Sequence, residues 1–180
     1  MKQTIIALAL IIFMACNKPI PRKNEITKID IATSGCFGSC PSIAISIDSS
    51  LNYKYYGGRY ASLRGYYLGR VTNEFWDSLN IKLENINYKR MDTNYSVAAD
   101  APESELIIHY GGQIRHIQTM VFGHPDSIVN VLNWLNYSYK HVKLYRSTDK
   151  IKFETTAQNE PPKPLVDSVE FPPPVKRPKN

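Results

Sequence analysis

The residues best placed for chemistry are two cysteines, Cys36 and Cys40, in the segment Cys-Phe-Gly-Ser-Cys-Pro. The glycine and proline residues around them allow a tight loop that brings both side chains together. Outside the cytoplasm, thiols placed in this way usually oxidise to a disulfide. Free thiolates at the same positions could instead exchange disulfides or bind a soft ion such as Cu(I), so three chemistries stay open for this loop.

A third cysteine, Cys16, ends an apolar segment at the N-terminus. Lys2 precedes an apolar run of about ten residues, 4–13, which is typical of a signal peptide and too short to span a bilayer. The segment Phe-Met-Ala-Cys that ends at Cys16 resembles a bacterial lipobox, in which the cysteine takes a diacylglycerol and becomes the mature N-terminus. We therefore expect a lipoprotein signal peptide over 1–15, lipidation of Cys16 and a tether over 16–24.

The composition agrees with an exported globular protein anchored to a membrane. Hydrophobic residues make up 43% of the chain and charged residues 21%, both ordinary values, and the net charge is +6. This small, dispersed positive charge gives little support for a nucleic-acid partner. Asn17 follows Cys16 where an aspartate would signal inner-membrane retention, so we expect the outer membrane, facing the periplasm. The expected partners are the membrane, through the lipid, and an envelope protein or glycan.

The elements that must position the cysteine loop follow from hydrophobic periodicity. Alternating residues predict strands and three- to four-residue apolar spacing predicts helices. The predicted strands are 25–33, 42–47, 51–56, 65–71, 106–110 and 114–121, and the predicted helices are about 75–85 and a segment from Pro125 to Val142. This order predicts an α+β fold, with a mainly antiparallel sheet, two helices packed on one face and the other face solvated. We expect this domain to cover 25–145, followed by a Pro-rich disordered tail over 146–180.

The cysteine loop and its surroundings resemble an uncharacterised family of bacterial lipoproteins. That family has a C-[F/Y]-G-x-C-P motif followed by an aliphatic strand, as found here from Cys36 onward. Further matching features are Tyr55 to Gly57, the Asp-Ala-Pro segment ending at Pro102, the Gly111-Gly112 hairpin and the Pro125 helix. The resemblance covers about residues 26–145 and implies the compartment and the fold, but no activity.

A second resemblance points to copper. The C-x-x-x-C-P loop is similar to the Cu(I)-binding loop of periplasmic copper chaperones for cytochrome oxidase, which use a distant histidine as third ligand. That resemblance would make Cys36, Cys40, His109 and His116 metal ligands, with His124 a further candidate. Those chaperones alternate strands and helices, whereas this chain begins with a run of strands.

The segment from residue 53 to residue 70 is rich in tyrosine and arginine. Such side chains can stack on sugars, peptides or bases, and Tyr56, Arg59 and Tyr60 are the predicted contact face. The alternative is that the tyrosines simply cover a half-buried sheet. We find neither a nucleophile elbow nor a phosphate-binding glycine loop, so we expect no catalytic residue and no cofactor. The sequence thus predicts a non-enzymatic binding or scaffold module, with a thiol-redox or copper-binding protein as the alternative.

Overall fold

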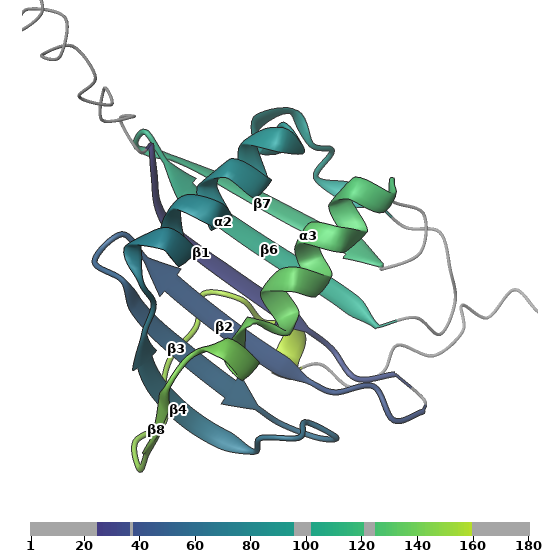
Figure 1. The fold of residues 1–180 in the computed structure, drawn as a ribbon. Helices are drawn as coiled ribbons and strands as arrows, with labels where there is room; N and C mark the ends of the chain where they lie inside the picture. Colours follow the sequence, from purple (N-terminus) through teal and green to yellow (C-terminus); the bar gives the residue numbers. More distant parts are fainter. Residues whose placement is uncertain (1–24, 37, 96–101, 121–124, 160–180) are drawn as a thin grey trace, which may run out of the picture.

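The structure is a computed structural model that describes residues 25–36, 38–95, 102–120 and 125–159. These residues form an eight-stranded sheet, in the order β5-β7-β6-β1-β2-β3-β4-β8, with two α-helices across one face (Figure 1). Neighbouring strands are antiparallel, except that β5 runs parallel to β7. The predicted α+β fold is therefore confirmed. The predicted signal peptide and tether lie outside the described residues.

The strands and helices have the following bounds. The strands are β1 (Ile26–Thr33), β2 (Ile43–Asp48), β3 (Asn52–Gly57), β4 (Gly65–Arg70), β5 (Asn94–Tyr95), β6 (Glu103–Tyr110), β7 (Gln113–Met120) and β8 (Leu144–Ser147). The helices are α2 (Asn73–Asn85) and α3 (Asp126–Asn136), with 3-10 turns η1 (Tyr88–Arg90), η2 (Ser138–His141) and η3 (Ala157–Asn159).

Alternating isoleucines build the face of the sheet that the helices cover. Ile31 of β1 lies opposite Ile45 of β2 on one side and Leu106 of β6 on the other. All three are essentially inaccessible to solvent. Because side chains alternate between the two faces of a strand, the intervening residues of β1 point to the opposite, second face.

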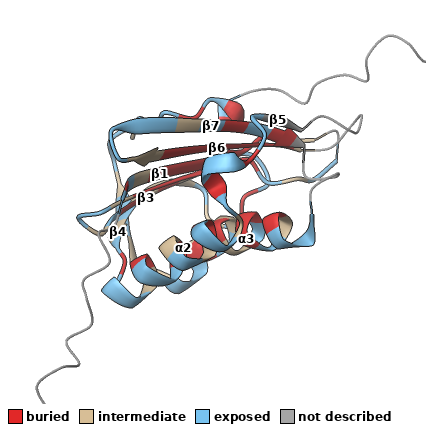
Figure 2. Ribbon diagram, turned by 90° about the horizontal axis from the view of Figure 1, so that it is seen from above, coloured by how far each residue is buried: buried red, intermediate tan, exposed pale blue. Residues whose placement is uncertain are grey.

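The two helices bury their apolar stripes against this face. Thr72 caps α2, its hydroxyl accepting a hydrogen bond from the Phe75 amide, as is typical of a threonine at this position. The rings of Phe75 and Trp134 stack with centroids 4.7 Å apart and join α2 to α3. Figure 2 shows both helices on the same side of the sheet, with buried residues turned toward it. The second helix is shorter than predicted. It ends at Asn136, and the apolar residues Tyr139 and Val142, which the prediction included in the helix, come after its end.

The middle of the second face is covered rather than solvated, which corrects the prediction there, whereas Leu68 of β4 and Ile114 of β7 remain exposed nearer the edges of the sheet. β8 pairs with β4 at the edge of the sheet, and residues 148–159 then cross the second face. Ala157 packs there against Ala32 and Ala44. The predicted domain boundary at 145 is therefore too early, and the segment from 146 to 159 is structured. Periodicity missed it because its contacts are few, polar and distant in sequence.

Candidate functional site

The cysteine loop joins β1 to β2 at one end of the sheet. The sulfur atoms of Cys36 and Cys40 lie 2.02 Å apart, which is a disulfide distance. The loop is tied down on both sides, since the Thr33 hydroxyl donates to the Pro41 carbonyl and the Ser34 hydroxyl accepts from the Glu103 amide. A bridge across so short a loop stabilises the turn by roughly 2 kcal/mol in the chain-entropy model.

A groove of about 380 Å³ lies beside this loop, between the β3–β4 connection and the end of α3. Three tyrosines, two asparagines and a lysine give it its chemical character. They are Tyr60, Tyr137, Tyr139, Asn133, Asn136 and Lys140. No carboxylate is among the described residues that line it. We call this site the tyrosine groove.

Two rings of the tyrosine groove remain open to solvent. Tyr60 is 42% exposed and Tyr137 is 54% exposed. Each is held by a cation over its face, Arg59 at 4.6 Å from the Tyr60 ring centroid and Lys140 at 4.6 Å from that of Tyr137. Arg59 also donates to the Tyr60 hydroxyl at 2.8 Å. The cations orient the rings while leaving aromatic surface available for a ligand.

The groove also contains an unsatisfied polar atom. The side-chain oxygen of Asn136 is buried and has no hydrogen-bond partner among the described residues. Buried acceptors are nearly always satisfied, because leaving one unpaired costs roughly 1–3 kcal/mol.

The structure divides the predicted contact face. Tyr60 lines the tyrosine groove, and Arg59 contacts the Tyr60 ring. Tyr56 instead stacks on Tyr66 with centroids 4.8 Å apart, and these two rings line a pocket of about 190 Å³ beneath residues 150–153. Tyr56 and Tyr60 therefore do not form one surface, because Tyr56 points to the second face of the sheet.

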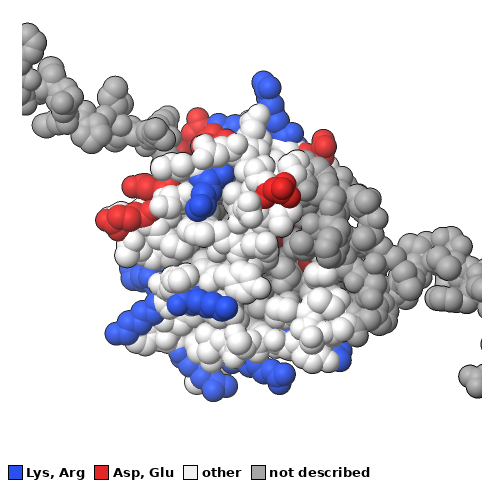
Figure 3. All heavy atoms as spheres, turned by 45° about the vertical axis from the view of Figure 1, so that its right-hand side comes forward, with Lys and Arg blue, Asp and Glu red and all other residues white. Residues whose placement is uncertain are grey.

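Charge is unevenly spread over the surface. In the view of Figure 3, the lower edge carries Lys and Arg side chains and almost no acidic ones, whereas the upper half carries most of the Asp and Glu side chains together with further Lys and Arg side chains. Since the tyrosine groove has a lysine and no carboxylate among its described lining residues, its own charge favours neutral or anionic ligands.

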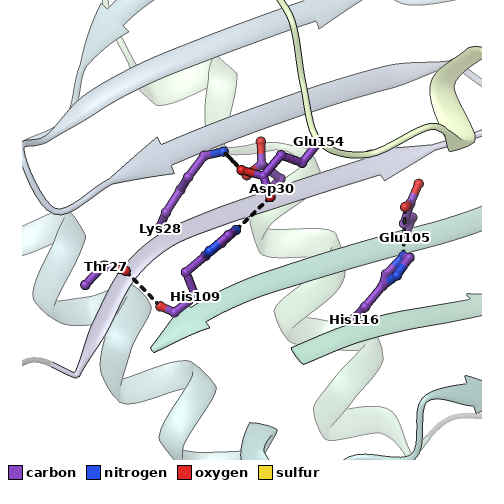
Figure 4. A network of polar contacts seen from close by, with 7 residues as sticks. All are labelled: Thr27, Lys28, Asp30, Glu105, His109, His116 and Glu154. Atoms are coloured by element: carbon purple, nitrogen blue, oxygen red, sulfur yellow. Dashed lines mark hydrogen bonds and ion pairs between the residues drawn. The ribbon is translucent and has the colours of Figure 1, made fainter. Parts of the chain in front are cut away.

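A cluster of ionisable side chains lies on the second face (Figure 4). The Lys28 ammonium contacts a carboxylate oxygen of Asp30 at 2.8 Å and one of Glu154 at 2.6 Å. The second oxygen of Glu154 contacts His109 Nε2 at 2.8 Å. We call these four residues the polar cluster. It ties the C-terminal segment to β1 and β6.

The polar cluster is electrostatically coupled. The hydrogen bond from Lys28 holds the pKa of the Glu154 carboxyl below its ordinary value. Burial alone would lower the pKa of Lys28, but its contacts with Asp30 and Glu154 outweigh burial and raise that pKa. Both residues therefore keep their charges at neutral pH.

Glu105 forms a second anchor for the same segment. Its side chain is 2% exposed, and one oxygen accepts hydrogen bonds from the amides of Thr156 and Ala157 at 2.6 and 2.9 Å. Its other oxygen contacts His116 Nε2 at 2.8 Å (Figure 4). The carboxylate is thus the acceptor for the backbone that enters η3.

The predicted copper ligands are not brought together. His109 pairs in register with Lys28, five residues along β1 from Thr33, so it lies roughly 16 Å along the strand from where the loop begins. It contacts Glu154, while His116 contacts Glu105. The candidate His124 lies outside the described residues. The two sulfurs contact each other rather than an imidazole.

Sequence reasoning missed several residues of both sites. The alternation of β1 puts Asp30 on the face opposite the helices, but its burial depends on the C-terminal segment, for which periodicity gave no signal. For Asn136 and Tyr137, the sequence contains only a weak indication of a binding site. They are a polar and an aromatic residue at the point where the apolar stripe of α3 ends.

The geometry defines a class of protein: an α+β domain with a cysteine-closed loop beside an open, aromatic groove. Residues 27–139 match the family model of the domain of unknown function DUF6438, so the chain belongs to that family. No curated protein matches the chain. Neither α2, α3 nor any other helix in the described ranges has the length and apolar character to cross a membrane.

Proposed function

We propose that this chain is a lipid-anchored cell-envelope protein whose domain binds a saccharide in the tyrosine groove. The observation that carries the proposal is the pair of exposed, cation-oriented rings of Tyr60 and Tyr137, which line one groove.

The groove's chemistry favours a sugar over other envelope ligands. Sugar rings present apolar C–H faces that pack on aromatic rings, and hydroxyls that bond to amides. Tyr60 and Tyr137 would supply the packing surface. Asn133 and Asn136 would supply the amides, and Lys140 would favour glycans that also carry carboxylates. A peptide partner is the competing ligand, and it would use the same rings.

The lipid anchor is supported by the N-terminal sequence. Cys16 follows a short apolar run, and a tether made of residues 16–24 would span at most about 30 Å if extended. In the outer membrane, facing the periplasm, the groove would then lie within reach of wall glycan close to the membrane.

The proposal is tested by co-sedimentation with purified peptidoglycan sacculi. The full chain carrying Cys16→Ser, purified in detergent, is compared with the double variant Tyr60→Ala/Tyr137→Ala. Losing two stacking contacts of about 1 kcal/mol each should weaken binding by at least about tenfold.

The matched control is Tyr145→Ala, which removes a 60% exposed ring on β8, away from the groove. It should bind like the parent chain. Failure of the parent chain to sediment, or equal losses in the control, would remove the saccharide proposal. Soluble wall-derived muropeptides and glycan strands freed of peptide, used as competitors, separate a sugar ligand from a peptide one.

A further inference from the structure

Asp30, in the polar cluster, is a fully buried carboxylate with incomplete partners. Its side chain is 0% exposed, and neither oxygen accepts a hydrogen bond of good geometry from the described residues. Among the residues that the structure describes, its only cation is the Lys28 ammonium, and the Lys28 side chain is 27% exposed. A buried carboxylate without hydrogen bonds is costly unless a cation compensates it.

Asp30 shares its surroundings with two further groups of metal-binding type. One ligand atom each from Asp30, His109 and Glu154 can be chosen so that all lie within 4.8 Å of one another. Ligands around Zn²⁺ at about 2.0–2.2 Å are themselves roughly 3.3 Å apart, so a small contraction suffices. Two of the three come from paired strands, β1 and β6, which fix their spacing.

We infer that the polar cluster is a binding site for a divalent transition-metal ion such as Zn²⁺, which takes the place now held by the Lys28 ammonium. Two carboxylates and a neutral imidazole give a net charge of −2, which the lysine only half compensates. A divalent ion neutralises it fully. One imidazole with two carboxylates is a ligand set that suits Zn²⁺ and leaves a fourth position for water.

When the metal displaces Lys28, another carboxylate lies close to this side chain. Lys28 lies directly opposite Asp48 in the β1–β2 register, so both side chains project from the second face. Lys28 can therefore exchange its contact with Asp30 for one with Asp48, whose carboxylate also accepts hydrogen bonds from Ser50 and Asn52. Because Glu154 belongs to the C-terminal segment, bound metal would also fasten residues 148–159 to the sheet. This site lies on the face opposite the tyrosine groove and does not depend on saccharide binding.

The test measures Zn²⁺ affinity by competition with a chromogenic chelator, together with the visible spectrum of the Co²⁺ form. The protein is the full chain carrying Cys16→Ser, purified without a polyhistidine tag. We expect one ion per chain, and we expect Asp30→Asn, His109→Ala and Glu154→Gln each to weaken binding by at least about tenfold. His116→Ala is the matched control, a histidine with a carboxylate partner on the same face, and it should leave the affinity within twofold of the parent.

A second variant separates a specific site from non-specific binding. Lys28→Met removes the competing cation, so Zn²⁺ should bind about tenfold tighter. Its melting temperature should fall without metal and recover with Zn²⁺. Lys28 and His109 are both partly exposed, so these variants should fold even if Asp30→Asn does not. Failure of the parent and Lys28→Met to bind one ion, equal losses in His109→Ala and His116→Ala, or no tightening in Lys28→Met would overturn the inference.

Discussion

The clearest consequence of the fold concerns Glu105, which anchors the C-terminal segment. Replacing it by alanine removes the acceptor of the Thr156 and Ala157 amides, which lie 2.6 and 2.9 Å from one carboxylate oxygen. A hydrogen bond to a charged group contributes roughly 1.5–3 kcal/mol, so the two together are worth about 3–6 kcal/mol. The loss of stability is smaller than this sum, because residues 148–159 can detach from the sheet and the freed amides then form hydrogen bonds with water. We therefore expect Glu105→Ala to lower the free energy of unfolding by about 3 kcal/mol.

The assay is thermal unfolding followed by circular dichroism, with amide hydrogen exchange read at residues 156 and 157. For a domain of this size, 3 kcal/mol corresponds to a fall in melting temperature of roughly 10 °C. His116→Ala is the control, because His116 is 48% exposed and its contact with Glu105 is screened by water. A Glu105→Ala chain that melts within about 2 °C of the parent, with unchanged exchange at both amides, would refute this reasoning.

Three further outcomes follow from the structure. Gly57→Ala should destabilise the protein strongly, because the added Cβ would lie 1.8 Å from the Leu63 carbonyl oxygen. Gly35→Ala should be tolerated, because its Cβ would meet nothing within 4 Å. Urea unfolding compares the stabilities of the two variants. Burial raises the pKa of Tyr88 to about 12, so its stabilising contribution is complete below pH 10 and is lost as the pH rises toward 12. Tyr88→Phe should remove this loss of stability at high pH. Because the Tyr88 hydroxyl has no hydrogen-bond partner among the described residues, the substitution should be neutral or stabilising. Urea titrations at pH 8 and pH 11 measure both effects. Alkylation of protein from native membranes before lysis, read by mass spectrometry, should leave both loop cysteines unmodified; labelled thiols or retained copper would favour the redox alternative.

Local patterns were enough to predict most of the sheet and both helices. The alternation from Ile43 to Ile47 identifies β2, and the Gly111-Gly112 pair identifies the β6–β7 hairpin; both glycines have positive φ angles, 52° and 76°, which favour glycine. These signals work because each element's own residues determine which face is buried.

The C-terminal segment could not be predicted in the same way. Its position depends on Glu105 and on the polar cluster, whose partners Lys28 and Glu154 are separated by 126 residues. Such contacts produce no periodic pattern in the sequence. Because prolines are frequent from Pro161 onward, the segment before them was assigned to the Pro-rich tail. Of the three residues predicted as a contact face, Tyr60 lines the tyrosine groove and Arg59 contacts its ring, whereas Tyr56 points to the second face of the sheet.

The most direct test of the central proposal is a titration of ¹⁵N-labelled full chain carrying Cys16→Ser with glycan strands freed of peptide, followed by NMR. The account predicts that shifts of backbone amides and of the Asn136 side-chain amide cluster around Tyr60, Asn136 and Tyr137. Amides of the polar cluster on the opposite face should stay in place. Spectra that do not change, or shifts centred on the second face of the sheet, would contradict the assignment of the groove as the ligand site.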